Sequence, residues 1–167
     1  SGVVTSYDSG TGALGVTVDS VTGSGTHTDW TISLSAAVIG SDLGKRVIQV
    51  KVIDDTTTLT TGDGKVIFLI PQELNGYNLV GANAFVTTVS SSGTPTVQIR
   101  NVTDAVDMLS TRITIDANEY TSYTAAAAAV VNATYDDVAT GDRLAVDVDV
   151  AGTGAKGLGI VLTFQLP

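Results

Sequence analysis

Apolar and polar residues alternate at every second position along several parts of this chain of 167 residues. Successive side chains of a β-strand point to opposite faces, so this period predicts strands with one buried face and one wet face. The clearest run sets Leu144, Val146, Val148 and Val150 against Ala145, Asp147 and Asp149. The last segment repeats it with Ile160, Leu162, Phe164 and Leu166. Both are predicted to be half-buried strands.

Shorter runs with the same period recur upstream, at Ile48/Val50/Val52, Val97/Ile99 and Ile113/Ile115. Turn-forming residues separate the runs, as in Thr61 to Gly64, Ser90 to Pro95 and Thr140 to Asp142. Many short strands at such spacing are typical of a sandwich or jelly roll. We therefore predict an all-β fold, with a jelly-roll-like antiparallel β-sandwich over residues 46–167.

Three segments depart from simple alternation. The run from Lys65 to Ile70 is apolar on both faces, which indicates a central strand covered on both sides or a strand at an interface. Residues Thr103 to Leu109 could form one or two helical turns with Asp104 as N-cap. Residues Ala125 to Ala129 favour a helix locally, but their Tyr, Thr and Val neighbours favour a strand, which we predict there.

Residues 1–45 are expected to form a separate attachment unit. Leu14/Val16/Val18 and Trp30/Ile32/Leu34 alternate on either side of the glycine-rich stretch Thr22 to Thr26. This pattern predicts a β-hairpin. A lone hairpin is marginally stable in water, so we expect it to pack on a neighbour.

The net charge of -9 opposes the phosphate neutralisation that nucleic-acid binding requires. The chain has no cysteine, which excludes disulfides and thiolate metal sites. No apolar run reaches the roughly 20 residues of a membrane-spanning helix, so no membrane insertion is expected. The chain starts with Ser1-Gly2 and no methionine, which is typical of residues left by a protease or of a fragment of a longer protein, so we expect the natural N-terminus to be missing.

Few residues suggest chemistry. The one histidine, His27, lies beside Asp29 in the glycine-rich stretch, where a catalytic base would lack rigid support. Acidic residues near turns could offer oxygen ligands to calcium, and the candidate set is Asp54, Asp55 and Asp63. Asp136, Asp137 and Asp142 form a second such group, with turn capping as the alternative for both. We predict no catalytic residue and no cofactor.

Tyrosines near the predicted connections are the candidate ligand-binding residues, because aromatic faces stack on sugars and anchor interfaces. Partial burial at strand ends is the alternative. The four candidates are Tyr77, Tyr120, Tyr123 and Tyr135.

Two parts of the chain resemble phage virion proteins. The order SYDSGTGAL, GSGT and W-x-I in residues 6–32 is similar to a module of phage tail-fibre proteins. Residues 54–101 and the closing GLGIVLTFQLP resemble a C-terminal domain of phage fibre and decoration proteins. The resemblance implies a trimeric β-rich assembly with an attachment segment, a distal domain and no cofactor.

Three functions are compatible with these features. The first is a non-enzymatic tail-fibre module on the virion surface that forms a homotrimer, contacts other virion proteins through residues 1–45 and binds a host-surface glycan or protein. The second is a capsid decoration or head-fibre protein bound to the particle. The third is a glycan depolymerase, which is disfavoured because no convergent acid and base are visible.

Overall fold

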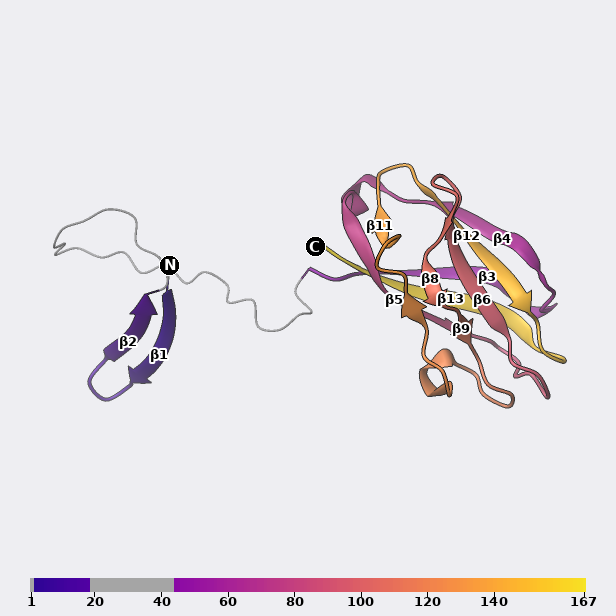
Figure 1. Cartoon of the computed structure of the whole chain (residues 1–167). Helices are drawn as coiled ribbons and strands as arrows, with labels where there is room; N and C mark the ends of the chain where they lie inside the picture. Colours follow the sequence, from indigo (N-terminus) through magenta and orange to yellow (C-terminus); the bar gives the residue numbers. More distant parts are fainter. Residues whose placement is uncertain (1, 19–43) are drawn as a thin grey trace. The chain divides into compact units, whose positions relative to one another are not determined.

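The computed structural model describes residues 2–18 and 44–167. The chain divides into two compact units, Ser1–Val38 and Ile39–Pro167, and each is described by itself (Figure 1). Among the residues that the structure describes, no helix has both the length and the apolar character needed to cross a membrane.

The first unit contains an antiparallel hairpin of β1 (Gly2–Asp8) and β2 (Ala13–Val18). The alternating residues near Leu14 do form a strand, as predicted, but its described partner is β1. The sequence interpretation missed β1, because Val3, Val4 and Tyr7 do not alternate regularly. The register shift between Val4 and Ser6 explains this irregularity. The expected second arm, Trp30 to Leu34, and its tip lie outside the described residues.

The turn of this hairpin is held by Asp8. Its Oδ1 accepts hydrogen bonds from the backbone N–H of Gly10 at 2.8 Å and of Thr11 at 3.3 Å, and Gly12 closes the turn with a positive φ of 71°. The hydrogen bond from the Thr11 side chain, followed by those from the backbone of Gly10 and Thr11, lowers the pKa of Asp8 below its ordinary 3.8.

A lowered pKa in the folded state means that the Asp8 carboxylate stabilises the turn at neutral pH and that this contribution is lost as the pH falls through the lowered pKa. We expect the amide shifts of Gly10 and Thr11 in NMR spectra to titrate with a midpoint below 3.8. An Asp8→Asn variant should not show this titration. A wild-type midpoint at or above 3.8 would contradict the described turn.

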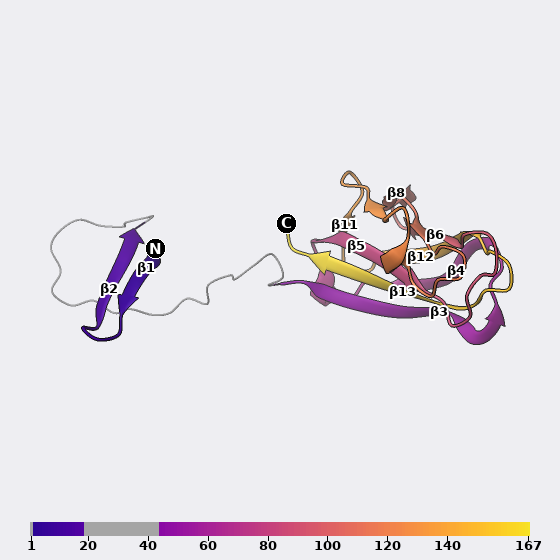
Figure 2. The same cartoon turned by 90° about the horizontal axis from the view of Figure 1, so that it is seen from below.

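The second unit is a sandwich of two antiparallel sheets (Figures 1 and 2). The first sheet has the order β11-β5-β13-β3, formed by Asp137–Val138, Tyr77–Phe85, Lys156–Gln165 and Arg46–Thr58. The second has the order β4-β12-β6-β7, formed by Gly62–Leu69, Arg143–Val150, Thr96–Asn101 and Val106–Asp107. β9 (Ile113–Thr114) also pairs with β6.

The path of the chain through these sheets is that of a jelly roll. Strands β3, β4, β5 and β6 alternate between the first and the second sheet. Strand β12 then inserts between β4 and β6, and β13 inserts between β5 and β3. The first strand of the unit therefore pairs with the last, β3 with β13. The prediction of an all-β, jelly-roll-like sandwich with a small N-terminal hairpin is confirmed.

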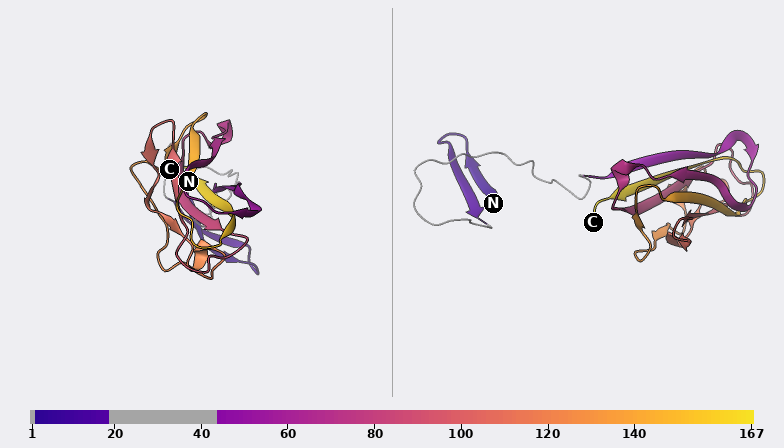
Figure 3. Two further views of the ribbon diagram at one scale, coloured as in Figure 1. Left: turned by 90° about the vertical axis from the view of Figure 1, so that its right-hand side faces the viewer. Right: turned by 90° about the horizontal axis from the view of Figure 1, so that it is seen from above.

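The pairing of β3 with β13 brings the start of β3 next to the end of β13 (Figure 3). Arg46, which begins β3, is the register partner of Phe164 near the end of β13. Tyr77 begins β5 at this same end, whereas Phe85 ends β5 opposite Gly159. We call the end with Arg46 the entry end and the end with Phe85 the far end.

The segment between β6 and β12 closes one side of the sandwich. It contains β8 (Leu109–Thr111) paired with β10 (Val130–Val131), and the 3-10 turn η2 (Ser122–Thr124). A second 3-10 turn, η1 (Gln72–Leu74), connects β4 and β5. The segment between β6 and β12 contributes Met108, Leu109, Ile113 and Ile115 to the core.

Two expectations for that segment are wrong. Residues 102–105 form a turn with Ala105 at a positive φ of 58°, and strand β7 follows, so no helix forms there. Residues 125–129 are neither strand nor helix. Side chains satisfy part of their backbone instead, because Asp116 accepts from the N–H of Ala126 and Thr114 donates to the carbonyl of Ala127.

Both predicted C-terminal strands contribute buried side chains to the core. Leu144, Val146 and Val148 of β12 face Ile160, Leu162 and Phe164 of β13 across the sandwich, and all six are buried. Burying each such side chain stabilises the fold by about 1.5–3 kcal/mol relative to leaving it exposed. Val150 and Leu166 were predicted to be buried but are exposed. A register shift precedes Val150, and Leu166 follows the end of β13.

The alternation predicted that the opposite face of β12 is exposed to solvent, but only part of it is. Ala145 and Asp147 are buried there, and Asp149 is exposed. The apolar run from Lys65 to Ile70 also differs from one expectation. It forms most of β4, which is an edge strand and not a central one, and Ile67 and Leu69 are exposed.

Candidate binding surface

The structure separates the four candidate tyrosines. Tyr77 is only 8% exposed and belongs to the core, so it is not available to a ligand. Tyr135 lies near the entry end, because the next residue, Asp136, accepts a backbone hydrogen bond from Leu79. Tyr120 and Tyr123 lie near the far end, because Thr121 between them bridges to Phe85. Phe85 lies six residue steps along β5 from Leu79, a distance of about 20 Å.

Tyr120 and Tyr123 belong to a loop of residues 119–124, which we call the tyrosine loop. Their side chains are 59% and 71% exposed. The backbone beneath them is fixed to β5, since Val86 N–H donates to the Tyr120 carbonyl at 2.9 Å and Ala84 N–H donates to Ser122 Oγ at 3.0 Å. Ser122 itself is buried. The loop thus presents two aromatic rings on an anchored backbone.

Local hydrogen bonds also order the tyrosine loop. Thr121 caps η2 by accepting from the N–H of Tyr123 at 2.9 Å. The Thr124 hydroxyl donates to Glu119 Oε2 at 2.8 Å. Such contacts reduce the conformational entropy that a loop loses when it binds a partner.

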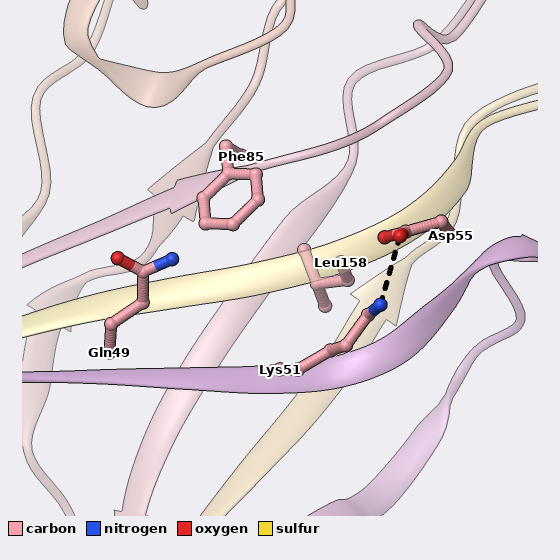
Figure 4. Close-up of a pocket in the computed structure, with 5 residues that line it drawn as sticks. All are labelled: Gln49, Lys51, Asp55, Phe85 and Leu158. Carbon is pink, nitrogen blue, oxygen red and sulfur yellow. Dashed lines mark ion pairs between the residues drawn. The ribbon is translucent and has the colours of Figure 1, made fainter.

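A shallow depression lies on the outer face of the first sheet, towards the same far end (Figure 4). Its volume is ≈ 200 Å³, and it is lined by Gln49, Lys51, Asp55, Phe85 and Leu158. Lys51 Nζ lies 2.9 Å from Asp55 Oδ2, and both side chains are exposed. The Phe85 ring lies directly against Gly159 of β13, because a glycine has no side chain that would occupy this space.

Sequence interpretation missed Phe85 as part of this surface. The signal was the pairing of Phe85 with Gly159, which lets the half-buried Phe85 ring lie against the glycine backbone. That pairing joins two strands that are far apart in the sequence. The depression adjoins the tyrosine loop through the bridge between Phe85 and Thr121.

The acidic candidates do not converge. Within the described residues, no three Asp, Glu or His side chains come together in a way that could hold a metal ion. Asp55 is paired with Lys51, while Asp54 and Asp63 are exposed on β3 and β4. The structure therefore offers no support for a calcium ion at Asp54, Asp55 and Asp63.

The second acidic group serves the backbone and neighbouring side chains. Asp142 is buried and accepts from Ala139 N–H at 2.8 Å and from Asn101 Nδ2 at 3.2 Å. Asp136 accepts a hydrogen bond from the side chain of Asn78 in β5. Asp137, in β11, is the register partner of the same Asn78. The alternative of turn capping therefore describes Asp142. His27 lies outside the described residues.

One partly buried ion pair was not predicted. Asp147 Oδ2 lies 2.8 Å from Arg100 Nε on the neighbouring strand β6, and Asp147 Oδ1 accepts from Gly64 N–H at 2.5 Å. The hydrogen bond and the charge of Asp147 raise the pKa of Arg100 above its ordinary value. This cluster connects three strands of the second sheet and lies outside the depression.

Comparison with protein-family models finds no match to this chain, and comparison with curated proteins finds none either.

Proposed function

We propose that this protein is a non-enzymatic module of a phage virion, and that its sandwich attaches the particle to a glycan on the host surface. The observation that carries the proposal is the pair of exposed tyrosines, Tyr120 and Tyr123, on an anchored loop at the far end. The phage context comes from the sequence resemblance.

The chemistry of the far end suits a sugar ligand. Tyrosine rings stack on the apolar faces of sugars, and their hydroxyls can form hydrogen bonds. The neighbouring depression adds the aromatic ring of Phe85 and the polar groups of Gln49, Lys51 and Asp55. An ordered aromatic surface of this kind binds with little loss of loop entropy.

The position of the surface also suits attachment. The chain enters the sandwich at Arg46, at the entry end, whereas the tyrosine loop lies next to Phe85 at the far end. A module tethered through its N-terminal side can therefore present the tyrosines away from the tether.

Each of the variants Tyr120→Ala and Tyr123→Ala is expected to weaken binding to host cells or to an immobilised host glycan about 10-fold, which corresponds to the loss of one aromatic contact of about 1.4 kcal/mol. Tyr135→Ala is the matched control, since Tyr135 is also exposed but lies at the entry end. Its affinity should equal that of the wild type. Equal binding by all three variants would exclude the tyrosine loop as the attachment surface.

A second candidate function, decoration of the capsid, is favoured by the N-terminal hairpin. Register pairs Val4/Val16 and Tyr7/Leu14 set these four apolar side chains on one face, and all four are exposed. Such a face suits a contact with another virion protein. Under this alternative, the protein would bind particles stripped of it and restore their stability, yet would show no affinity for host cells.

A further inference from the structure

The outer face of the first sheet continues from the depression towards the entry end as rows of side chains. Residues of β13 that alternate with the buried Ile160 and Leu162 point outwards, and the register gives their neighbours on β5 and β3. The rows, from the far end, are Phe85/Gly159/Lys51, Asn83/Val161/Gln49 and Gly81/Thr163/Val47. We call these residues the outer-face track.

The outer-face track has almost no charge, although the chain has a net charge of -9. Lys51 is the one charged residue of the track, and its Nζ lies 2.9 Å from Asp55 Oδ2, so the two charges compensate each other. The other side chains of the track are apolar, a hydroxyl or amides. A polyanionic ligand would therefore approach an acidic protein and meet no unpaired cation in the track, whereas an uncharged ligand is not repelled.

Two amides of the middle row are placed to bind hydroxyl groups. The Ser122 hydroxyl donates to Asn83 Oδ1 at 3.3 Å and accepts from Ala84 N–H at 3.0 Å, so the tyrosine loop orients the Asn83 amide. Within the described residues, Asn83 Nδ2 and the side-chain amide of Gln49 have no hydrogen-bond partner. An amide offers both donors and acceptors, and it therefore matches the hydroxyls of a sugar.

Phe85 connects the outer-face track to the tyrosine loop. Its backbone bridges to Thr121, and its half-buried ring lies against Gly159 (Figure 4). The path from Phe85 to Gln49 crosses two strand spacings and one step of two residues, about 12 Å between the backbone positions. One sugar ring does not span this distance and also reach the tyrosines, but a chain of sugars does.

We propose that the glycan bound by the tyrosine loop is a linear, uncharged polysaccharide, and that its chain continues over the outer-face track. This rests on the proposed function, because it extends the ligand site of Tyr120 and Tyr123. A sugar ring packs on Phe85, and hydroxyls of the chain form hydrogen bonds with Asn83 Nδ2 and the Gln49 amide. The depression of ≈ 200 Å³ is shallow, which suits a chain that lies along the surface.

NMR titration of the full chain tests the length and the charge of the ligand together. The probes are uncharged disaccharides and hexasaccharides of glucose, mannose and galactose, and a hexasaccharide of galacturonic acid. At least one uncharged hexasaccharide should shift the amides of both the tyrosine loop and residues 159–163. Its disaccharide should bind at least about 10-fold more weakly, because it makes fewer of these contacts. The acidic hexasaccharide should bind more weakly than the uncharged one.

Gln49→Ala and Asn83→Ala should each weaken binding of the hexasaccharide about 5-fold, through the loss of one hydrogen bond. Gln49 is exposed, so its variant should keep the wild-type circular dichroism spectrum. Gln72→Ala is the matched control, because Gln72 is an exposed amide on η1, outside the first sheet. Its affinity should equal that of the wild type.

The outcomes separate this inference from the proposed function. A hexasaccharide that shifts the tyrosine loop but not the outer-face track would overturn the inference and leave host attachment intact. If no uncharged hexasaccharide binds, or if the acidic one binds as tightly, the inference is overturned, and the host-cell test of the tyrosine variants still decides the proposed function. Protection of the track from hydrogen exchange that rises with protein concentration would show that a second copy covers it, with the same consequence.

Discussion

Asp147→Ala is expected to lower the free energy of unfolding of the sandwich by about 2–3 kcal/mol. The carboxylate is 7% exposed and binds both Arg100 and Gly64 N–H. Its removal leaves the partly buried Gly64 amide and the Arg100 guanidinium without their partner. The cost is lower than for a fully buried pair, because Arg100 is 31% exposed and can be partly rehydrated.

Asp149→Ala is the matched control for this variant. Asp149 lies two residues along the same strand and also pairs with an arginine, Arg112, at 2.6 Å, but its side chain is 36% exposed and that of Arg112 is 49% exposed. Its loss should cost less than about 0.5 kcal/mol. Urea unfolding followed by circular dichroism distinguishes the two variants. Equal losses of stability in the two variants would show that the burial of Asp147 does not determine how much its ion pair contributes to the free energy of unfolding.

Gly157→Ala is expected to destabilise the sandwich by about 3 kcal/mol. Gly157 has a φ of +59°, a conformation that costs residues with a side chain about 1–2 kcal/mol. A Cβ atom there would also lie 2.9 Å from the Cα of Asp55 and would collide with the Thr87 hydroxyl. Since one of these neighbours is backbone, the strain cannot be relieved by a side-chain rotation.

Gly154→Ala separates the two causes. Gly154 also has a left-handed φ, +74°, but nothing lies within 4 Å of the position of a Cβ. This variant should show the conformational cost alone, about 1 kcal/mol. The two glycines lie three positions apart and can be compared in the same unfolding experiment. If both variants lose the same stability, the close approach of β13 to Asp55 and Thr87 is not a constraint.

Local alternation predicted the core strands β3, β6, β12 and β13, but no prediction covered β5, which also contributes to the core. The buried positions of β12 and β13 follow from their period-2 pattern, because each strand has one face on the core. The same reasoning failed where burial depends on a neighbouring strand. Asp147 is buried because Arg100 and Gly64 meet it there, and neither can be assigned to it without the register of the second sheet.

Strand order was a second limit. The apolar run from Lys65 to Ile70 is typical of both a central strand and an interface strand, and only the sheet topology shows that β4 is an edge strand. β1 was missed because a bulge interrupts its alternation near Thr5. Both cases depend on pairing between strands, which a single sequence does not contain.

The candidate surface was predicted in part. Tyr120 and Tyr123 were correctly placed in an exposed connection, but Tyr77 is buried because it begins β5 and packs into the core. Tyr135 lies in a different region from the other two. The Phe85 platform required knowledge that Gly159 is its partner across the sheet.

The pairing of the first strand of the sandwich with the last has a mechanical consequence. Hydrogen bonds between antiparallel strands run perpendicular to the strand axis. Tension between Arg46 and the end of the molecule that carries Phe85 would act along β3 and β13, and would therefore load the bonds between these strands together in shear. Peeling, in which bonds break one after another, would require a force across the strands instead.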